Sequence, residues 1–235
     1  MDALQKFSIP LAIIIAGTFI AGALYYGGND GIAGEAGTPS VNVNIKNVKI
    51  NASDPVIGGK NAPVTLAYWF DYQCPFCKAV DVGGIPQIPI EPSLPSLIKD
   101  YVETGKLKIV FKDYAFLGPD STTAALYMHA IWDLYPEKFY GWHEAMFVAQ
   151  DEEHGGFGDE KSILSLIQKI PGLDADRLKK QVADKRNEYT ALIEANQKEG
   201  ASFGIQGTPG FITAKQLIPG AEQLSTFKTA IDAQL

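Results

Sequence analysis

The chain has 235 residues, a net charge of -7 at neutral pH and hydrophobic residues at 46% of its positions. This length and composition are enough for one good hydrophobic core with room for an inserted subdomain. The acidic balance and the lack of a basic stripe argue against nucleic acid as a partner. The three histidines, His129, His143 and His154, lack metal-ligand spacing, so we expect no bound metal.

The N-terminal segment predicts a membrane span. Residues 7–26 contain no charge, and a helix of this length is about 30 Å long, enough to cross a hydrocarbon core. Because Lys6 precedes the run, we expect residues 1–6 to be cytoplasmic and the chain from Gly27 onward to lie outside. Ala21-Gly22-Ala23 leaves a cleaved signal peptide as the alternative, although the apolar run continues beyond it and favours an uncleaved signal anchor.

Residues 27–53 are expected to be a flexible linker and lead-in. Gly, Ala, Asn, Thr and Pro dominate as far as Ser40, and such a segment has little to bury. Val41–Ile45 alternates with period two, which is typical of a short edge strand or of an extended lead-in. We expect the folded domain over residues 54–235.

Both cysteines of the chain lie in one motif, Cys74-Pro75-Phe76-Cys77, directly after residues 63–70. That preceding run is β-branched and aromatic, and it predicts a buried strand. Pro75 suits the first turn of a helix, whose N-terminus would offer unpaired N–H groups and a partial positive charge to Cys74. Since the thiolate is the reactive form and such surroundings lower a thiol pKa, the motif favours thiol–disulfide exchange.

Two other interpretations of the cysteine pair stay open. A structural disulfide over so short a loop would remove little entropy from the unfolded chain, and a secreted scaffold normally carries several pairs. A zinc half-site would need a second pair of ligands, and neither another CxxC nor paired histidines are present.

The remaining sequence predicts a β-α-β unit, a block of helices and a β-β-α ending. A Gly/Pro-rich loop over residues 82–95 separates the cysteines from the next helix. Hydrophobic periodicity places the further elements as follows: helix 93–103, strand 107–111, helices 121–134, 136–150, 160–170, 174–186 and 188–203, strands 207–213 and 216–220, and helix 221–235.

This order, with a CxxC opening the first helix and a Thr-Pro before the third strand, resembles the thioredoxin fold. More closely, it resembles the DsbA-like thiol–disulfide oxidoreductases, which carry a helical insertion in that place. The resemblance runs from about Asp54 to the C-terminus and implies an α/β thioredoxin-like fold with an all-helical insertion at about 119–203. The segments that match are 54–58, 61–64, 70–77, 205–209 and 218–221.

The resemblance also implies roles for individual residues. Cys74 matches the exposed nucleophilic cysteine, and Cys77 matches the more buried resolving cysteine. Pro209 matches a proline that follows a cis peptide bond and faces the disulfide. Thr208 matches the residue whose backbone pairs with an extended client peptide.

Further candidates surround the cysteines. Phe76, with Pro75, lies at an exposed helix start and is expected to contact the client protein. The Pro75-Phe76 dipeptide replaces the Pro-His of the most oxidising relatives, and this difference favours a milder redox potential. Asp71 is a candidate proton relay to Cys77, with turn capping as the alternative. Tyr72 is a candidate for an apolar rim. We expect the other aromatic and histidine side chains to pack or to lie on the surface: Trp69, Trp132, Trp142, His129 and His143.

These predictions describe a single-pass membrane protein whose extracytoplasmic domain introduces disulfides into exported proteins. The Cys74–Cys77 disulfide would be its redox group, with no other cofactor. Its partners would be unfolded or reduced exported proteins and a membrane redox partner that resets the disulfide. The alternatives are a membrane-tethered disulfide reductase or isomerase, and a client-binding, chaperone-like module whose CxxC is idle.

Overall fold

The computed structural model describes residues 43–151 and 155–235. The expected cytoplasmic end, signal anchor and most of the linker lie outside the described residues. Within the described ranges, no helix is both long and apolar enough to cross a membrane.

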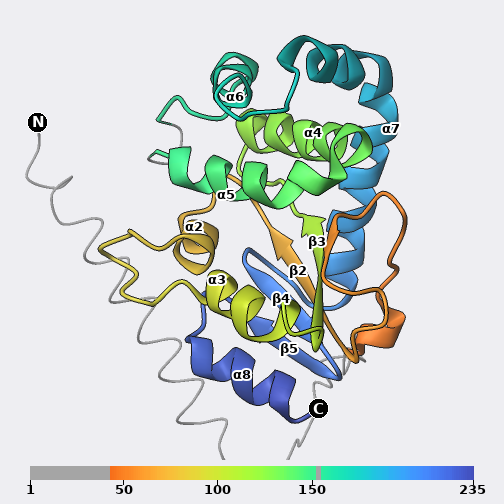
Figure 1. Ribbon diagram of the computed structural model, residues 1–235, viewed down its shortest axis with the longest axis vertical. Coiled ribbons are helices and arrows are strands. Elements are labelled where there is room, and N and C mark those ends of the chain that lie inside the picture. Colours follow the sequence, from red (N-terminus) through yellow and green to blue (C-terminus); the bar gives the residue numbers. More distant parts are fainter. Residues whose placement is uncertain (1–42, 152–154) are drawn as a thin grey trace, which may run out of the picture. The chain divides into compact units, whose positions relative to one another are not determined.

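The domain consists of a five-stranded sheet, helices beside it and a helical insertion (Figure 1). Its elements are η2 (Ile45–Asn47), β1 (Val56–Ile57), β2 (Val64–Phe70), α2 (Pro75–Asp81), α3 (Ser93–Leu97), η3 (Ile98–Val102), β3 (Leu107–Asp113), α4 (Pro119–Leu134), η4 (Pro136–Lys138), α5 (Phe139–Ala149), α6 (Glu160–Ile167), α7 (Ala175–Ser202), β4 (Gly210–Thr213), β5 (Gln216–Pro219) and α8 (Leu224–Asp232).

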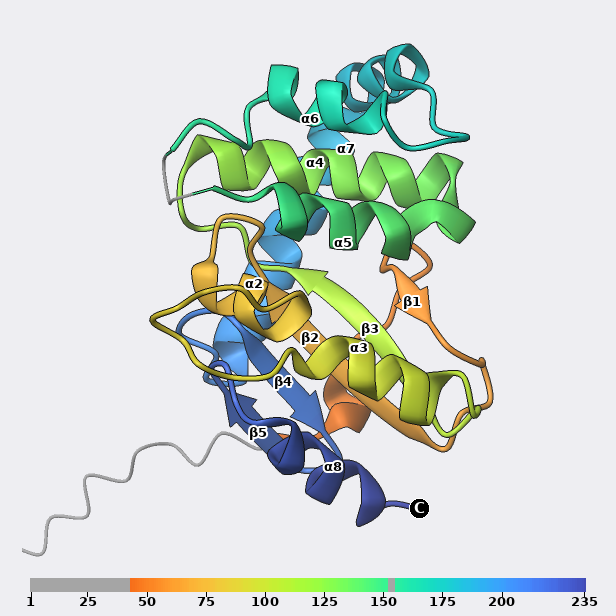
Figure 2. The same cartoon turned by 60° about the vertical axis from the view of Figure 1, so that its left-hand side comes forward.

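The strands run in the order β1-β3-β2-β4-β5. β2 pairs in parallel with β3, and the other neighbours are antiparallel. Side chains alternate across β2, as the pleat of a strand requires. Tyr68 and Phe70 join the main core, whereas Ala67 and Trp69 join a smaller cluster. The helices α2, α3 and α8 follow one another along one side of the sheet (Figure 2).

The insertion comprises α4, α5, α6 and α7 and lies beyond one end of the sheet (Figure 1). Its helices run from Pro119 to Ser202, between β3 and β4. α7 is one helix of 28 residues, so the predicted division into 174–186 and 188–203 is wrong. No Gly or Pro interrupts the chain from Ala175 to Glu199, and the backbone hydrogen bonds of the helix therefore continue. This length lets α7 reach from the insertion back to β3.

The N-terminal lead-in is part of the folded body. The described part of the 41–45 segment forms no strand; Ile45 begins the 3-10 turn η2 and donates its N–H to the Ala214 carbonyl at 2.7 Å. Val48 is buried against the smaller cluster. The described part of this segment is therefore a lead-in and not an edge strand. The folded body begins before Asp54. The two-residue strand β1 was not predicted, because it is too short for a periodic signal.

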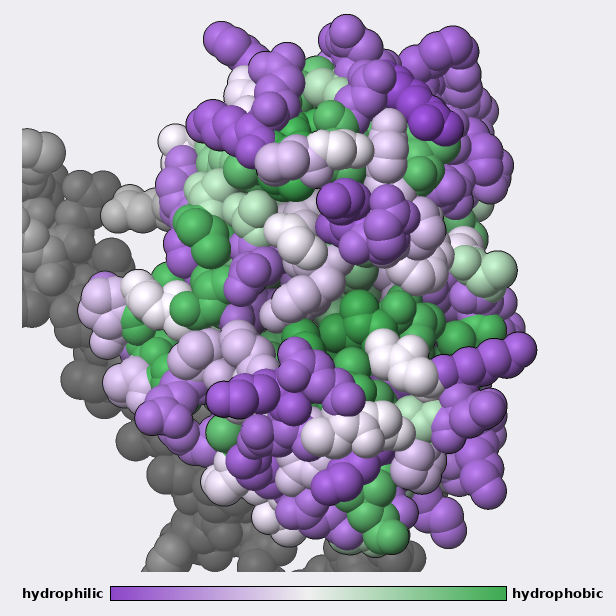
Figure 3. All heavy atoms as spheres, in the orientation of Figure 1, coloured by the Kyte–Doolittle hydropathy of each residue, from purple (hydrophilic) through white to green (hydrophobic). Residues whose placement is uncertain are grey.

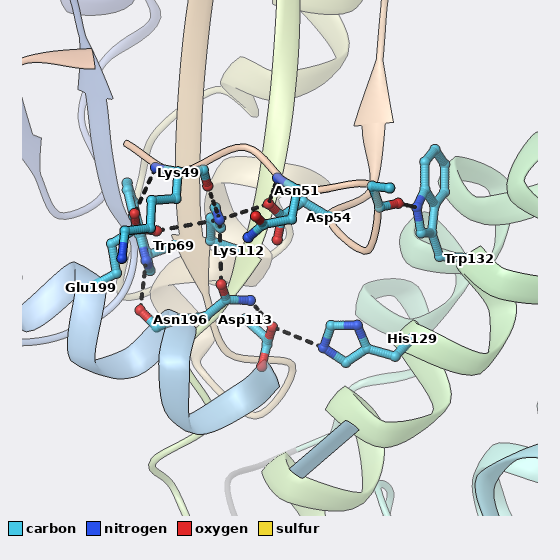
Figure 4. A network of polar contacts seen from close by, with 11 residues as sticks. Lys49, Asn51, Asp54, Trp69, Lys112, Asp113, His129, Trp132, Asn196 and Glu199 are labelled. Atoms are coloured by element: carbon cyan, nitrogen blue, oxygen red, sulfur yellow. Dashed lines mark hydrogen bonds and ion pairs between the residues drawn. The ribbon is translucent and has the colours of Figure 1, made fainter. Parts of the chain in front are cut away.

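A buried cation joins the lead-in, the sheet and α7 (Figure 4). Lys112 of β3 is fully buried, and its Nζ lies 2.8 Å from Asp54 Oδ2 and 3.3 Å from Glu199 Oε2. The same nitrogen donates to the Lys49 carbonyl at 2.5 Å and to Asn196 Oδ1 at 3.4 Å. A buried charge is tolerated when it is paired and hydrogen-bonded, as this one is.

The same network continues into the insertion. Asn196 donates to Asp113 Oδ1 at 2.6 Å, and His129 Nε2 of α4 lies 3.3 Å from that oxygen. Nearby, Trp132 donates its indole N–H to the Ala52 carbonyl at 2.9 Å (Figure 4). His129 is therefore a buried polar partner rather than a surface residue, and these contacts fix α4 and α7 against the thioredoxin-like body.

Removing the buried cation tests this network. Lys112→Met leaves the Asp54 carboxylate buried without its charge partner, so we expect a loss of about 3–5 kcal/mol in the free energy of unfolding. Denaturant titration measures that loss. Lys108→Met is the matched control on the same strand, because Lys108 is half-buried and, among the described residues, its Nζ forms one hydrogen bond, to the Lys60 carbonyl at 3.3 Å; its expected change is within about 0.5 kcal/mol. Equal unfolding midpoints for the two variants would contradict the account.

Candidate active site

The two cysteines lie at the start of α2, directly beyond the end of β2. Cys74 is the N-cap residue, and its carbonyl accepts from the N–H groups of Cys77 and Lys78, both at 3.1 Å. Pro75 occupies the first turn, where its missing N–H costs no hydrogen bond. Both cysteines are free thiols. Cys74, expected to be exposed, is buried with 4% of its surface exposed, whereas Cys77 is fully buried, so Cys74 is the sulfur that lies nearer to solvent.

The second half of the site comes from the chain just before β4. The Thr208–Pro209 peptide bond is cis. β4 pairs with β2 so that Gly210 stands opposite Trp69, which carries Thr208 to the start of α2. The Cys74 thiol donates to the Thr208 carbonyl at 3.3 Å across 134 residues of sequence. The structure therefore brings together Cys74, Cys77, Thr208 and Pro209.

The surroundings shift the pKa values of the two thiols in opposite directions. The neighbouring Cys77 thiol is the largest cause that lowers the pKa of Cys74, to about 7, and the Thr208 hydroxyl and the N–H groups of Cys77 and Phe76 lower it further. Burial acts in the opposite direction on Cys74. Burial and the neighbouring Cys74 raise the pKa of Cys77 well above that of an ordinary thiol. Cys74 therefore ionises before Cys77.

The Thr208 hydroxyl is poised for the Cys74 thiolate. Its Oγ1 is buried and has no hydrogen-bond partner among the described residues. A buried hydroxyl without a partner costs free energy, so an acceptor that forms beside it is favoured. The Thr208 carbonyl accepts from the Cys74 thiol, and we expect the hydroxyl to donate to the thiolate when it forms.

Asp71 acts as a cap rather than as part of the sulfur chemistry. Its carboxylate accepts from the N–H groups of Gln73 at 2.9 Å, Phe116 at 2.9 Å and Leu117 at 3.1 Å. Burial raises the pKa of Asp71, and these donors oppose that rise. Among the described residues it forms no hydrogen bond with either sulfur. These contacts match the turn-capping alternative and not the proton relay.

An apolar groove lies beside the cysteines. It has a volume of about 370 Å³, and its walls include Phe76, Ile205, Pro209 and Leu217. Phe76 is 49% exposed, whereas Tyr72 is buried, so the expected rim consists of Phe76 without Tyr72. Hydrophobic residues also reach the surface over the region of α2 in the face seen in Figure 3. Trp69 packs in the core, as predicted.

Residues of the insertion hold the active-site loop, and none of them was predicted to do so. Gln150 donates its side-chain amide to the carbonyls of Tyr72 at 2.6 Å and Cys74 at 3.2 Å. Gln73 donates to the Phe157 carbonyl at 3.0 Å. These contacts span 76 to 84 residues of sequence, and an amide side chain in a helical block carries no motif that would identify it.

His143 was expected to pack or to lie on the surface, and it is a buried member of a polar chain with Asp81. A signal for Asp81 did exist: it follows Cys77 by four residues and therefore shares the same helix face, where a carboxylate is out of place in a core. Within the described ranges, no three His, Cys, Asp or Glu side chains are grouped to hold a metal ion.

Comparison with known proteins agrees with this geometry. A family model described as thioredoxin matches residues 50–233. Disulfide bond formation protein D of Bacillus subtilis (strain 168) is 26% identical over 208 residues, which cover 88% of this chain and 83% of that protein. A probable disulfide bond formation protein D of Bacillus anthracis is 25% identical over 181 residues, covering 76% of this chain and 77% of that protein.

Solved structures give the same fold. The thiol-disulfide exchange protein alpha-DsbA2 from Wolbachia pipientis has 28% identity and a TM-score of 0.64, covering 77% of this chain and 87% of that chain. Oxidised BdbD from Bacillus subtilis has 24% identity and a TM-score of 0.67, covering 77% of this chain and 92% of that chain.

Alkylation of the reduced protein tests the assigned acidities. Because iodoacetamide reacts with thiolates, its rate should rise with pH about a midpoint near 7, the pKa of Cys74. Mass spectrometry of the products should find the label on Cys74 and not on buried Cys77. A midpoint above 8.5, the value of a free thiol, would contradict the assignment.

The Thr208 hydroxyl can be tested in the same assay. Thr208→Val removes the donor while keeping a β-branched shape, so the alkylation midpoint of Cys74 should move upward toward that of an ordinary thiol. Thr208→Ser keeps the hydroxyl and should keep the wild-type midpoint. Identical midpoints for the valine and serine variants would show that the hydroxyl does not stabilise the thiolate.

Proposed function

Since the chain belongs to the thioredoxin family whose model spans residues 50–233, we propose that it is a protein thiol–disulfide oxidoreductase that introduces disulfides into exported proteins. The observation that carries this proposal is a pair of cysteines beside the cis Thr208–Pro209 bond whose thiol pKa values are shifted in opposite directions. The relatives named for disulfide bond formation and thiol-disulfide exchange support it.

The reaction begins from the Cys74–Cys77 disulfide. A client thiolate attacks Cys74 Sγ, a client–Cys74 bond forms, and Cys77 leaves with the electron pair and takes up a proton. A second client thiolate then attacks the client sulfur of this mixed disulfide, and Cys74 leaves as a thiolate. Counted from its two thiols, the client loses two electrons and two protons; Cys77 takes up one proton, and the other passes to solvent or to the Cys74 thiolate, which completes the reduced enzyme.

The local environment favours this direction of transfer. A leaving thiolate of lower pKa departs faster, and Cys74 has a pKa of about 7. The same environment stabilises the reduced enzyme, which is the product form. Phe76 stands where the most oxidising relatives carry a histidine. Without that imidazole to lower the pKa of Cys74 further, this cysteine pair is a milder oxidant than theirs.

Two features hold a client protein: the exposed backbone at Thr208 and an apolar groove. The Thr208 backbone lies at the open end of β4, where an extended peptide adds alongside the chain with little sequence preference. Phe76 and the groove that Pro209 and Leu217 help to line receive an apolar client side chain. Unfolded or reduced proteins supply both features, whereas folded proteins bury them.

The proposal extends to where the enzyme works. Residues 7–26 anchor it in the membrane as a single uncleaved span, and the domain lies on the extracytoplasmic side, where clients emerge. A membrane redox partner must accept two electrons from the Cys74–Cys77 dithiol to reset it. No other cofactor is assigned to the chain.

Cysteine variants test the mechanism with a reduced, unfolded client. Cys74→Ser should abolish client oxidation, because it removes the attacked sulfur. Cys77→Ser, first converted at Cys74 to its mixed disulfide with glutathione, should exchange the glutathione for the client and accumulate a client–Cys74 mixed disulfide, because no Cys77 sulfur remains to release the client in the reverse direction. Non-reducing gel electrophoresis and thiol titration measure both outcomes. A Cys74→Ser chain that oxidises the client at the wild-type rate would overturn the proposal.

A further inference from the structure

A chain of buried polar groups extends away from Cys77, and the reaction described above does not use it. Asp81 lies one helical turn beyond Cys77 on α2 and is buried. Its Oδ2 accepts from the Tyr68 hydroxyl at 2.5 Å, and its Oδ1 lies 2.6 Å from His143 Nε2. These two hydrogen bonds hold the Asp81 carboxyl group between Tyr68 and His143.

The far end of this chain fixes the histidine. His143 Nδ1 lies 2.9 Å from the Tyr72 hydroxyl. With Tyr72 donating to Nδ1, Nε2 carries the ring proton and donates to Asp81. The rings of Phe70, Phe111 and Phe139 surround the imidazole with centroids 4.9 to 5.5 Å away. Water is therefore kept from the network, which strengthens its hydrogen bonds.

The near end of the chain meets the resolving cysteine. Tyr68 and Cys77 are both fully buried in the main core. Asp81 follows Cys77 by one helical turn, so the two side chains share a face of α2, and the Tyr68 hydroxyl donates to Asp81 on that face. Burial, the Asp81 carboxylate and the Cys77 thiol all raise the pKa of Tyr68. Cys77 has no contact with bulk water, so it needs an internal proton acceptor when it attacks and an internal proton donor when it leaves.

We propose that Tyr68 and Asp81 carry the proton of Cys77, and that His143 positions Asp81 for this transfer. When Cys77 attacks a mixed disulfide, its proton passes to the Tyr68 oxygen while the Tyr68 proton passes to Asp81 Oδ2. Asp81 becomes a neutral acid that donates back to Tyr68, and Tyr68 donates to the Cys77 thiolate. The reverse transfer protonates Cys77 when it leaves. The role rests on the proposed function, because it concerns the resolving step of that exchange.

The other ionisable groups around Asp81 do not provide this route. From α5, Tyr140 faces it, and burial and the Asp81 charge raise the pKa of Tyr140. From β3, Asp113 is close enough to raise the pKa of Tyr72, but its Oδ1 is bound by Asn196. On α2 itself, Lys78 donates to the Gln150 carbonyl at 2.5 Å. Asp71 is occupied by backbone donors, so the relay expected there is assigned to Asp81.

Glutathione disulfide separates the two steps of exchange. Excess oxidised glutathione reacts with the reduced 235-residue chain first at Cys74, and Cys77 then displaces the glutathione. Acid quenching and mass spectrometry follow both species from pH 5 to 9. Tyr68→Phe and Asp81→Asn should slow the second step at least about tenfold near pH 6. The first step should stay within about twofold, and the deficit should shrink toward pH 9, because a larger fraction of Cys77 is then ionised before it attacks and needs no relay.

Matched variants separate the relay from a structural role. His143→Gln keeps an N–H donor for Asp81 and should retain the second step, whereas His143→Leu should lose it. Tyr101→Phe removes a hydroxyl bound to Asp232 at 2.8 Å elsewhere in the core and should change neither step. Tyr68→Phe deletes a single oxygen, so it serves as the test if the Asp81 variant does not fold.

The outcomes are distinct. A folded Tyr68→Phe chain with the wild-type release rate and pH profile would overturn the relay. Equal rates for His143→Gln and His143→Leu would overturn the positioning role of the histidine. If the wild-type chain releases glutathione through Cys77 but does not oxidise a reduced client, the proposed function fails and the relay stands.

Discussion

The antiparallel pairing of β2 with β4 is the constraint on which the site depends. β2 delivers Cys74 to the start of α2, and β4 follows the cis Thr208–Pro209 bond. With Trp69 opposite Gly210, the two strand ends meet, and the Cys74 thiol reaches the Thr208 carbonyl. A shift of this register by one residue would turn the side chains of β4 to the wrong face and separate the halves of the site.

The difference in burial between the two sulfurs turns this geometry into chemistry. Cys74 is near the surface, with donors that stabilise its thiolate, and Cys77 is enclosed in the core, where a thiolate is disfavoured. One cysteine can therefore meet a client while the other reacts only within the protein. The enclosure of Cys77 also creates the need for an internal proton path, which Tyr68, Asp81 and His143 are placed to supply.

Much of this site was within reach of the sequence. The cysteine spacing, the proline at the helix start and the distant Thr-Pro are local patterns, and each is found where it was predicted. The long-range polar contacts were not predictable, because nothing in the local sequence pairs Lys112 with Asp54 or His143 with Asp81. Asp71 was a candidate relay with turn capping as the alternative, and its side chain accepts from three backbone N–H groups, as the capping alternative requires. The continuous helix α7 was divided because its apolar stripe is interrupted near Arg186, while its backbone is not.

If the Cys74–Cys77 pair gives disulfides to other proteins, its redox state in the cell must reflect that role. Thiol trapping in intact cells measures this state: acid quenching preserves it, and alkylation before and after reduction distinguishes dithiol from disulfide. Most of the chain should carry the Cys74–Cys77 disulfide at steady state, since a donor must be kept oxidised. A chain found mainly as the dithiol would contradict this role and would indicate a reductase or isomerase.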